Sequence, residues 1–298
     1  MIRIIYHNDN DGKCSAFIAR HFLEFKAEAV VCEKADYDTK VLETIPIAES
    51  DTVYILDYSI SPDDMRKLLD ITPNVVWIDH HKTSLAEYEN FDLPVSGIRD
   101  TKSKKSGALL TWEWFSQRRA PQFVLLVSDW DTYTFEYGTD TELFHYGIIS
   151  IGNDPMDNGW DLAWENLQHV LDMGSPAMNY AVNTSVECVT DTGFWIEWED
   201  CICYAVNGRQ DSKIMAQVAP SAEMWVTFRY TGECWMVGLA SDQDGVNVRE
   251  IAEKYKYNGR SGGGHDHAAG FECETLPFDL SRKVQESRQT SPTPATAG

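Results

Sequence analysis

The sequence predicts an α/β protein with two domains, and three observations lead to this. In the first half, short apolar runs alternate with segments of helical periodicity. In the last third, strand-like runs follow one another more closely. The length of 298 residues is sufficient for two hydrophobic cores. We therefore expect a largely parallel N-terminal sheet with helices on both faces, a helical connector, and a smaller C-terminal α+β domain.

The N-terminal domain is expected over residues 1–150, and each element has a local reason. Lys13–Phe25 carries its apolar residues on one side, which is typical of a helix against a sheet. Ser61 and Pro62 form a good N-cap and first-turn pair for a helix over Asp63–Asp70. A further helix is expected at Lys105–Gln117. Strands are expected at Ile2–Tyr6, Ala29–Cys32, Thr52–Leu56 and Val75–Ile78, and the apolar run from Gln122 to Val127 is interpreted as another strand.

The remaining segments have a different character. Residues 139–184 are mainly helical in pattern, and we expect the connector at 151–185. The C-terminal domain is expected at 186–280, with a glycine-rich stretch near its end. The tail at 281–298 is rich in Ser, Thr, Pro and Ala, and we expect it to be disordered. The C-terminal domain should contain strands at Cys201–Val206, Met224–Tyr230 and Cys234–Leu239 and a helix at Val246–Tyr255.

Charge and composition exclude several classes of protein. The formal net charge of −22 argues against binding long duplex DNA, which requires a basic face. It permits a short single-stranded RNA or a small phosphorylated nucleotide. No signal peptide or membrane-spanning stretch is apparent, and the seven cysteines are scattered and odd in number. We expect a cytoplasmic protein with reduced thiols that acts as a monomer or homodimer away from membranes.

Acidic residues and histidines follow the apolar runs of the first half. In a parallel sheet, ligands bind beyond the carboxyl ends of the strands. A lone aspartate after a strand is more often a turn former or helix cap, but four such groups in one half of the chain favour a shared site. The groups are His7, Asp9 and Asp11, then Asp57, then Asp79, His80 and His81, and finally Asp129 and Asp131.

Such a convergence of carboxylates needs cations. Two carboxylates about 4 Å apart repel by roughly 4 kcal/mol at an effective dielectric constant of 20. Carboxylate oxygens mixed with imidazole nitrogens suit manganese, iron, cobalt or zinc better than calcium. Gly12 permits a sharp entry from the first strand into the helix. The sequence therefore predicts a metal centre at the carboxyl edge of the N-terminal sheet.

Five motifs in this order resemble the DHH phosphoesterase superfamily, which is named after an aspartate-histidine-histidine motif. They are "HNDNDG", "LDYS", "IDHHKTS", "SDWDTY" and, far downstream, "GGGHDHAAGF". The resemblance covers roughly residues 1–280 and is greatest to the nanoRNase/oligoribonuclease-like branch. It implies an N-terminal DHH domain with two divalent metals, usually Mn2+, and a C-terminal DHH-associated domain that binds substrate.

The resemblance also implies roles for individual residues. His7 and Asp9 should bind one metal, Asp11 and His80 the second, and Asp57 both. Asp129 should complete the coordination, although the D-W-D spacing leaves Asp131 as a rival. Two further residues should act in catalysis: Asp79 by orienting its neighbours, and His81 by donating to a phosphate oxygen.

The glycine-rich stretch predicts a loop that holds phosphate. It is not a Walker A loop, because no Gly-Lys-Ser/Thr follows it, and a flexible linker is the structural alternative. Lys82, Lys104 and Lys105 are further candidate phosphate contacts. This sequence has Ala240-Ser241 where many members of the superfamily have an arginine-serine pair. The substrate-binding residues expected are Arg260, Gly262, Gly263, Gly264, His265 and Ser106.

The resemblance, together with the acidic charge, implies a Mn2+-dependent phosphodiesterase that degrades very short RNA to mononucleotides. Members of this branch also tend to act on 3′-phosphoadenosine 5′-phosphate. Hydrolysis of cyclic or linear dinucleotide signals is the alternative activity, and an inorganic pyrophosphatase fits less well. A non-catalytic nucleotide-binding regulator is disfavoured, because none of the expected ligands is missing.

Overall fold

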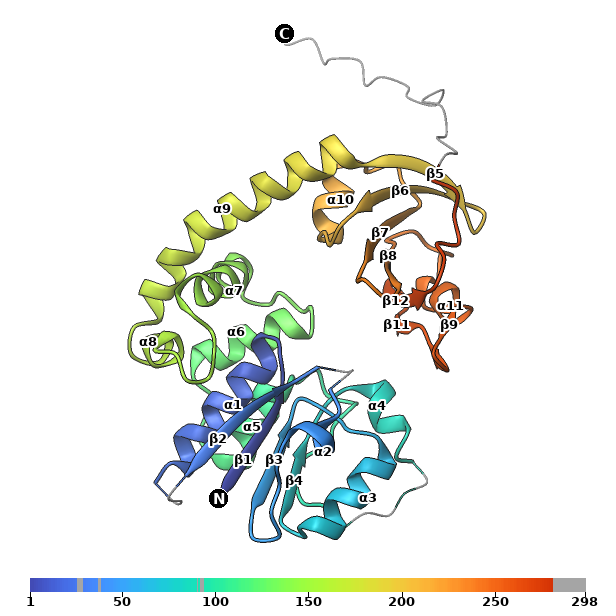
Figure 1. The fold of residues 1–298 in the computed structure, drawn as a ribbon. Coiled ribbons are helices and arrows are strands. Elements are labelled where there is room, and N and C mark those ends of the chain that lie inside the picture. Colours follow the sequence, from blue (N-terminus) through green and yellow to red (C-terminus); the bar gives the residue numbers. More distant parts are fainter. Residues whose placement is uncertain (26–28, 37–38, 90, 92–93, 281–298) are drawn as a thin grey trace. The chain divides into compact units, whose positions relative to one another are not determined.

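The chain forms two compact units in the computed structural model, which describes residues 1–25, 29–36, 39–89, 91 and 94–280 (Figure 1). The first unit is Met1–Asn179, and the second begins at Tyr180. The boundary lies inside a single long helix, α9 (Leu167–Thr192). The expected disordered tail at 281–298 lies outside the described residues. No helix of the described part is both long and apolar enough to cross a membrane.

The first unit contains a four-stranded sheet in which every strand is parallel to its neighbours. The strand order is β2-β1-β3-β4, so the first strand of the chain lies in the interior of the sheet. The carboxyl ends of β1, β3 and β4 consequently meet at one edge, as expected from the sequence. The strands are β1 (Ile2–His7), β2 (Val30–Ala35), β3 (Thr52–Leu56) and β4 (Val75–Ile78).

Helices cover both faces of this sheet because its strands are apolar on both sides. Ile4 and Tyr6 pack against α1 and α5 on one face. Ile5 and Val53 lie on the other face with α3. The predicted α/β class is therefore confirmed. The helices are α1 (Asn10–Leu23), α2 (Val41–Thr44), α3 (Pro62–Ile71), α4 (Lys82–Ala86) and α5 (Gly107–Phe115).

A helical layer follows, and here one sequence prediction is wrong. The apolar run after Pro121 is the helix α6 (Gln122–Asp131) and not a strand. Phe123, Val124, Leu126 and Val127 have helical spacing and are buried in one cluster with the outer side of α1. The layer is completed by α7 (Thr139–Ile151), α8 (Gly159–Glu165) and the first part of α9.

The second unit is an α+β domain with a mixed six-stranded sheet in the order β11-β12-β8-β7-β6-β5. Its core joins Val226, Leu239 and Phe271 from the sheet to Val248 and Ile251 from α11. The elements are β5 (Phe194–Trp198), β6 (Cys201–Asn207), α10 (Ser212–Val218), β7 (Met224–Tyr230), β8 (Trp235–Ala240), α11 (Val248–Glu253), the short pair β9 (Lys256–Tyr257) and β10 (Arg260–Ser261), β11 (Gly263–His265) and β12 (Ala268–Cys273).

The glycine-rich stretch of the second unit is largely strand, whereas the sequence predicted a loop. Gly264 has a φ of 144° and pairs with Ala269 across the β11–β12 hairpin. A Cβ at Gly262 would lie 2.5 Å from the Phe271 Cβ. Packing inside this hairpin therefore accounts for two of the three consecutive glycines.

Candidate active site

The end of β1 turns directly into α1 and carries the first two side chains of the site. Asp9 Oδ1 accepts a hydrogen bond from the Gly12 amide at 2.9 Å, which caps the helix. Asp9 Oδ2 lies 2.8 Å from His7 Nδ1. A Cβ at residue 12 would lie 2.1 Å from the His7 carbonyl oxygen, so only glycine permits this turn. Burial raises the pKa of Asp9, but the contacts with His7 outweigh it and leave the pKa at about 2.

Asp11 lies in the first turn of α1, and the beginning of α5 holds it in place. Its carboxylate accepts hydrogen bonds from the Gly107 amide at 2.6 Å and from the Ala108 amide at 2.9 Å. These amides belong to the first turn of a helix, where the dipole favours negative charge. Asp11 is therefore fixed in the interior, with 2% of its surface exposed.

Asp57 follows β3 in a strained conformation. Its φ is 53°, in the left-handed region that non-glycine residues rarely adopt. Its amide donates to the Ile78 carbonyl at 2.8 Å. Both of its carboxylate oxygens are buried, and neither has a hydrogen-bond partner among the described residues. Strain and unpaired buried oxygens at one residue are typical of a functional position.

His80 follows β4 and faces three carboxylates. Its Nε2 lies 3.2 Å from Asp57 Oδ1, 3.4 Å from Asp131 Oδ2 and 3.7 Å from Asp11 Oδ2. In spite of these distances, the described residues satisfy neither His80 Nε2 nor Asp131 Oδ2 with a hydrogen bond, and both atoms are buried. The edge of the sheet thus holds several buried donor atoms that lack protein partners.

These donors form three overlapping sets in which all ligand atoms lie within 4.8 Å of one another. Asp57 is common to two sets and His80 is common to two, so the sets share residues and do not form separate sites. Oxygen and imidazole donors at this spacing fit a divalent cation. The sets are His7-Asp9-Asp57, Asp57-His80-His81 and Asp11-His80-Asp131.

The electrostatics of the cluster also favour a cation. Burial raises the pKa of Asp57 well above its usual value, and the charges of Asp11, Asp9 and Asp131 raise it further. The pKa of Asp131 is raised for the same reasons. Burial lowers the pKa of His80, so its imidazole is neutral, as a metal ligand must be. A bound cation would remove the repulsion between these carboxylates.

Comparison with known proteins identifies the fold around this cluster. No protein-family model matches the chain. An uncharacterized protein of Acanthamoeba polyphaga mimivirus is 21% identical over 300 residues, which are 93% of this chain and 69% of that protein. Among solved structures, the DHH domain of a member of a ribosomal-protein family matches with a TM-score of 0.59 and 15% identity, over 90% of this chain and 82% of that one.

The chain has the DHH fold. A pGpG-specific phosphodiesterase from Vibrio cholerae matches as well, with a TM-score of 0.51 and 14% identity, over 92% of this chain and 94% of that one. The resemblance inferred from the motifs is thereby confirmed at the level of the fold. The nanoRNase branch stays a prediction.

The aspartate of the DHH motif organises the histidines that follow it. Asp79 is fully buried, and its Oδ1 accepts hydrogen bonds from the His80 amide at 2.7 Å and the His81 amide at 3.1 Å. The same oxygen lies 2.7 Å from His81 Nδ1, and Ser59 donates to Oδ2. Burial lowers the pKa of His81, but the hydrogen bond to Asp79 outweighs it and raises the pKa to about 9. Asp79 therefore fits the orienting role implied by the resemblance.

We expect Asp79→Asn to destabilise the metal-free protein by about 3–5 kcal/mol, because a buried charge pair loses one partner. The raised pKa of His81 contributes stability that is complete below pH 6.5 and is lost as the pH rises through about 9. The stability of Asp79→Asn should therefore not decrease over this pH range. Denaturant unfolding between pH 7 and pH 9.5 measures both effects. Asp63→Asn, which removes an exposed ion pair with Arg66, is the control and should cost less than about 1 kcal/mol; equal losses in the two variants would contradict the prediction.

The structure corrects the expectation that Asp129, and not Asp131, is the candidate ligand from α6. Asp131 faces His80, whereas Asp129 does not belong to any of the donor sets. Successive helical residues are rotated by about 100°, so residues two apart point to different sides. The Asp129 carboxylate instead accepts hydrogen bonds from Thr134 Oγ1 at 2.6 Å and from the Glu136 amide at 2.8 Å.

This assignment predicts opposite behaviour for two neighbouring variants. Asp131→Asn should weaken the binding of Mn2+ by about 10- to 100-fold, since it removes a donor from the cluster. Asp129→Asn should lower the stability and leave the affinity for the cation unchanged. Calorimetric titration with Mn2+ and thermal unfolding distinguish the two. A loss of affinity confined to Asp129→Asn would reverse the assignment.

Two residues expected to bind substrate have structural tasks instead. Ser106 is fully buried and is the N-cap of α5, so it is not available to a phosphate. The Gly262 amide donates to the Tyr255 carbonyl at 3.0 Å, so this N–H is already used within the protein. Arg260 and His265 are exposed in the second unit. Gly263 has open space at its Cα.

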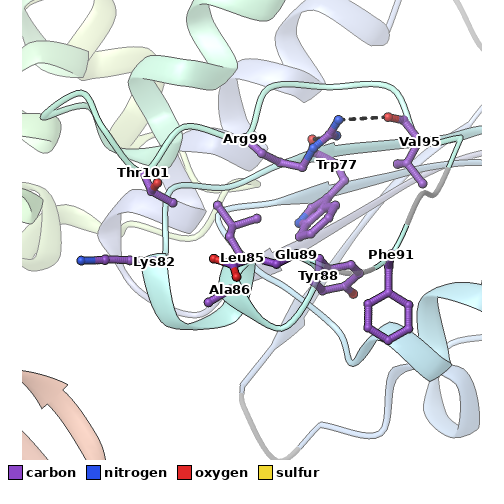
Figure 2. A pocket seen from close by; sticks show the side chains of 10 residues that line it. All are labelled: Trp77, Lys82, Leu85, Ala86, Tyr88, Glu89, Phe91, Val95, Arg99 and Thr101. Carbon is purple, nitrogen blue, oxygen red and sulfur yellow. Dashed lines mark hydrogen bonds between the residues drawn. The ribbon is translucent and has the colours of Figure 1, made fainter.

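Lys82 begins α4 directly after His81 and lines a cavity of about 520 Å³ in the first unit. Figure 2 shows Lys82 and Thr101 at one end of this cavity and Phe91 at the other. Arg99 in its wall donates to the Val95 carbonyl at 3.2 Å. Lys105 lies 2.9 Å from Glu113, and this ion pair competes with any role in phosphate binding.

Sequence analysis did not predict a set of residues that contacts the segment between Asp9 and Asp11. Asn10, between Asp9 and Asp11, accepts a hydrogen bond from Asn153 at 2.6 Å and lies 3.2 Å from His145 Nδ1. Burial lowers the pKa of His145 to about 4, so the ring is neutral. His145 and Asn153 stand more than 130 positions from Asn10, and no local pattern indicates such contacts.

Proposed function

We propose that this chain is a two-metal phosphodiesterase that hydrolyses very short RNA oligonucleotides to mononucleotides, with Mn2+ as its metal. The observation that carries the proposal is the set of buried, unpartnered donor atoms on Asp57, His80 and Asp131 at the edge of a DHH sheet. Such a set of carboxylates and imidazoles suits Mn2+.

The overlapping donor sets support a division of the ligands between two cations. His7 and Asp9 would hold one, Asp11, His80 and Asp131 the other, and Asp57 would contact both. When bound, paired divalent cations lower the pKa of water and neutralise phosphoryl oxygens.

The remaining groups orient the ligands and supply charge. His81 Nδ1 lies 2.7 Å from Asp79 Oδ1, and in the metal-free protein this contact raises the pKa of His81 in spite of burial, which suits a donor to a phosphate oxygen. Asp79 fixes the orientation of this ring. The positive φ of Asp57 is a strained backbone conformation of the kind that functional positions retain.

The substrate class follows from charge. A net charge of −22 disfavours long strands, which gain affinity from many phosphate contacts, and permits a substrate with only a few phosphates. A cyclic or linear dinucleotide signal is the second candidate, favoured by the likeness to the pGpG-specific phosphodiesterase. Hydrolysis of 3′-phosphoadenosine 5′-phosphate is a further activity of the same proposal. The seven free cysteines suit a cytoplasmic enzyme.

The experiment is a competition in one tube. The protein is incubated with Mn2+, a 5′-labelled RNA dinucleotide and a labelled 24-mer, with a chelator in a parallel tube. Loss of the dinucleotide with an intact 24-mer supports the proposal. An intact dinucleotide shifts the assignment to cyclic dinucleotides or phosphoadenosine phosphate, and equal loss of both RNAs contradicts the argument from charge.

A further inference from the structure

The turn after α6 is built around strained aromatic residues. Tyr133 has a φ of 57° and Phe135 a φ of 51°, both in the left-handed region. Side chains with a Cβ are unfavourable there, and aromatic residues have no local hydrogen bond that compensates. Two such residues in one short turn require surroundings that hold them in place.

Asp129 provides those surroundings. Its carboxylate accepts hydrogen bonds from Thr134 Oγ1 at 2.6 Å, from the Glu136 amide at 2.8 Å and from the Tyr137 amide at 3.1 Å, and Thr141 also donates to it. These hydrogen bonds lower the pKa of Asp129, although burial raises it. Asp129 therefore holds the strained turn in shape.

A continuous series of rings joins this turn to the metal cluster. Tyr133 packs edge-on against Phe135 at 4.8 Å between centroids, and Phe135 against Trp130 at 5.8 Å. Trp130 stacks on His145 at 3.7 Å, and His145 contacts Asn10 between two expected ligands. At the other end Tyr133 stands two residues after Asp131, so their Cα atoms are at most about 7.6 Å apart.

Tyr133 is the exposed member of the series, with 62% of its surface accessible. A nucleotide also places its base several ångströms from its phosphate, so an exposed aromatic residue this near to Asp131 along the chain is a candidate for contact with the base. We propose that Tyr133 stacks on the nucleobase of the nucleotide whose phosphate lies at the metal cluster, and so determines the preference for nucleotides over simpler phosphate esters. The inference rests on the proposed function and adds a subsite to it. Aromatic stacking accepts every base, which suits a substrate of variable sequence.

The test measures binding and does not depend on turnover. The 5′-monophosphate of 2-aminopurine riboside is titrated with protein in Mg2+, because Mn2+ quenches fluorescence by itself. Tyr133→Asn removes the ring and keeps a residue that tolerates positive φ, whereas Tyr133→Phe keeps the ring. Tyr180→Ala is the control, since Tyr180 is 76% exposed on α9. We expect quenching in wild type, Tyr133→Phe and the control, and about 5- to 100-fold weaker binding without quenching in Tyr133→Asn.

A second measurement separates this inference from the proposed function. Hydrolysis of an RNA dinucleotide should show a higher KM in Tyr133→Asn, whereas a dinucleotide with an abasic position beside the scissile phosphate should not distinguish the variants. Equal affinity and quenching in wild type and Tyr133→Asn overturn the inference, whether or not the dinucleotide is cleaved. Quenching that depends on Tyr133 without any cleavage supports the subsite and contradicts the proposed reaction. Absence of nucleotide binding by wild type overturns both.

Discussion

Asp57→Asn is expected to make the metal-free protein more stable and to abolish the proposed hydrolytic activity. Burial and four neighbouring carboxylates raise the pKa of Asp57, so the ionised form is unfavourable in the folded state. A raised folded pKa means that stability decreases as the pH rises above the unfolded value of about 4. Asparagine is uncharged, so the variant avoids the cost of a buried negative charge. It also tolerates the φ of 53° at this position.

In the presence of a cation, wild type should become more stable than Asp57→Asn. At a concentration 100 times its dissociation constant, a cation stabilises wild type by about 2.7 kcal/mol, whereas the variant, without the shared carboxylate, gains little. Activity should decrease more than about 100-fold. Thermal unfolding with chelator and with Mn2+ measures both effects.

Asp200→Asn is a matched control for this experiment, because Asp200 is exposed and has a similar φ of 59°. It should change neither the stability nor the response to Mn2+. A stabilisation of Asp57→Asn by Mn2+ equal to that of wild type would remove Asp57 from the metal centre.

Gly107→Ala is expected to damage the cluster through a single methyl group. An added Cβ would lie 2.5 Å from the Asp57 Cβ and 2.6 Å from its Oδ1. In an ordinary helix, replacing glycine with alanine stabilises by about 1 kcal/mol. Here the overlap should destabilise the protein by about 1–3 kcal/mol and displace the Asp57 carboxylate, which two of the three donor sets share. Denaturant unfolding and Mn2+ affinity measure the two consequences.

A double-mutant cycle shows whether the clash is the cause. Asp57→Gly removes the side chain that the methyl group would strike and suits a positive φ. Combined with Asp57→Gly, Gly107→Ala should no longer destabilise, which gives an interaction free energy of about 1–3 kcal/mol. Additive free energies would show that Gly107 is required for another reason.

The sequence predicted which strand ends carry the residues of the candidate site, and the structure brings these residues together. Three of the four expected groups follow β1, β3 and β4, and parallel strands bring their carboxyl ends to one edge without further information. His7, Asp9, Asp11, Asp57 and His80 were predicted for this reason, and all five occur in the donor sets.

The fourth group was predicted from the wrong element. The run before Asp129 is apolar throughout, and such a run does not distinguish a buried strand from a buried helix. In a strand, Asp129 and Asp131 would point to the same side, whereas in α6 they do not. The helical spacing appears only in the structure, where Phe123, Val124, Leu126 and Val127 are buried and Leu125 is less so.

Other errors concern side chains and amides that have partners within the protein. Ser106 is a suitable phosphate donor by its chemistry, but it caps α5. The Gly262 amide donates to the Tyr255 carbonyl, and Asn10 contacts His145 in α7, which lies far along the chain. These partners are set by tertiary packing, so composition and local spacing cannot reveal them.

The wide separation of the ligands along the chain has a kinetic consequence. The donors extend from His7 to Asp131, and they meet only after the parallel sheet, α1, the start of α5 and the end of α6 have assembled. Contacts between residues this far apart in the sequence are costly to form early, so we expect the folding transition state to lack a complete donor set. A cation should therefore leave the folding rate unchanged and express its whole stabilisation as slower unfolding. A cation bound at these donors would thus prolong the lifetime of the native state without guiding the chain to it.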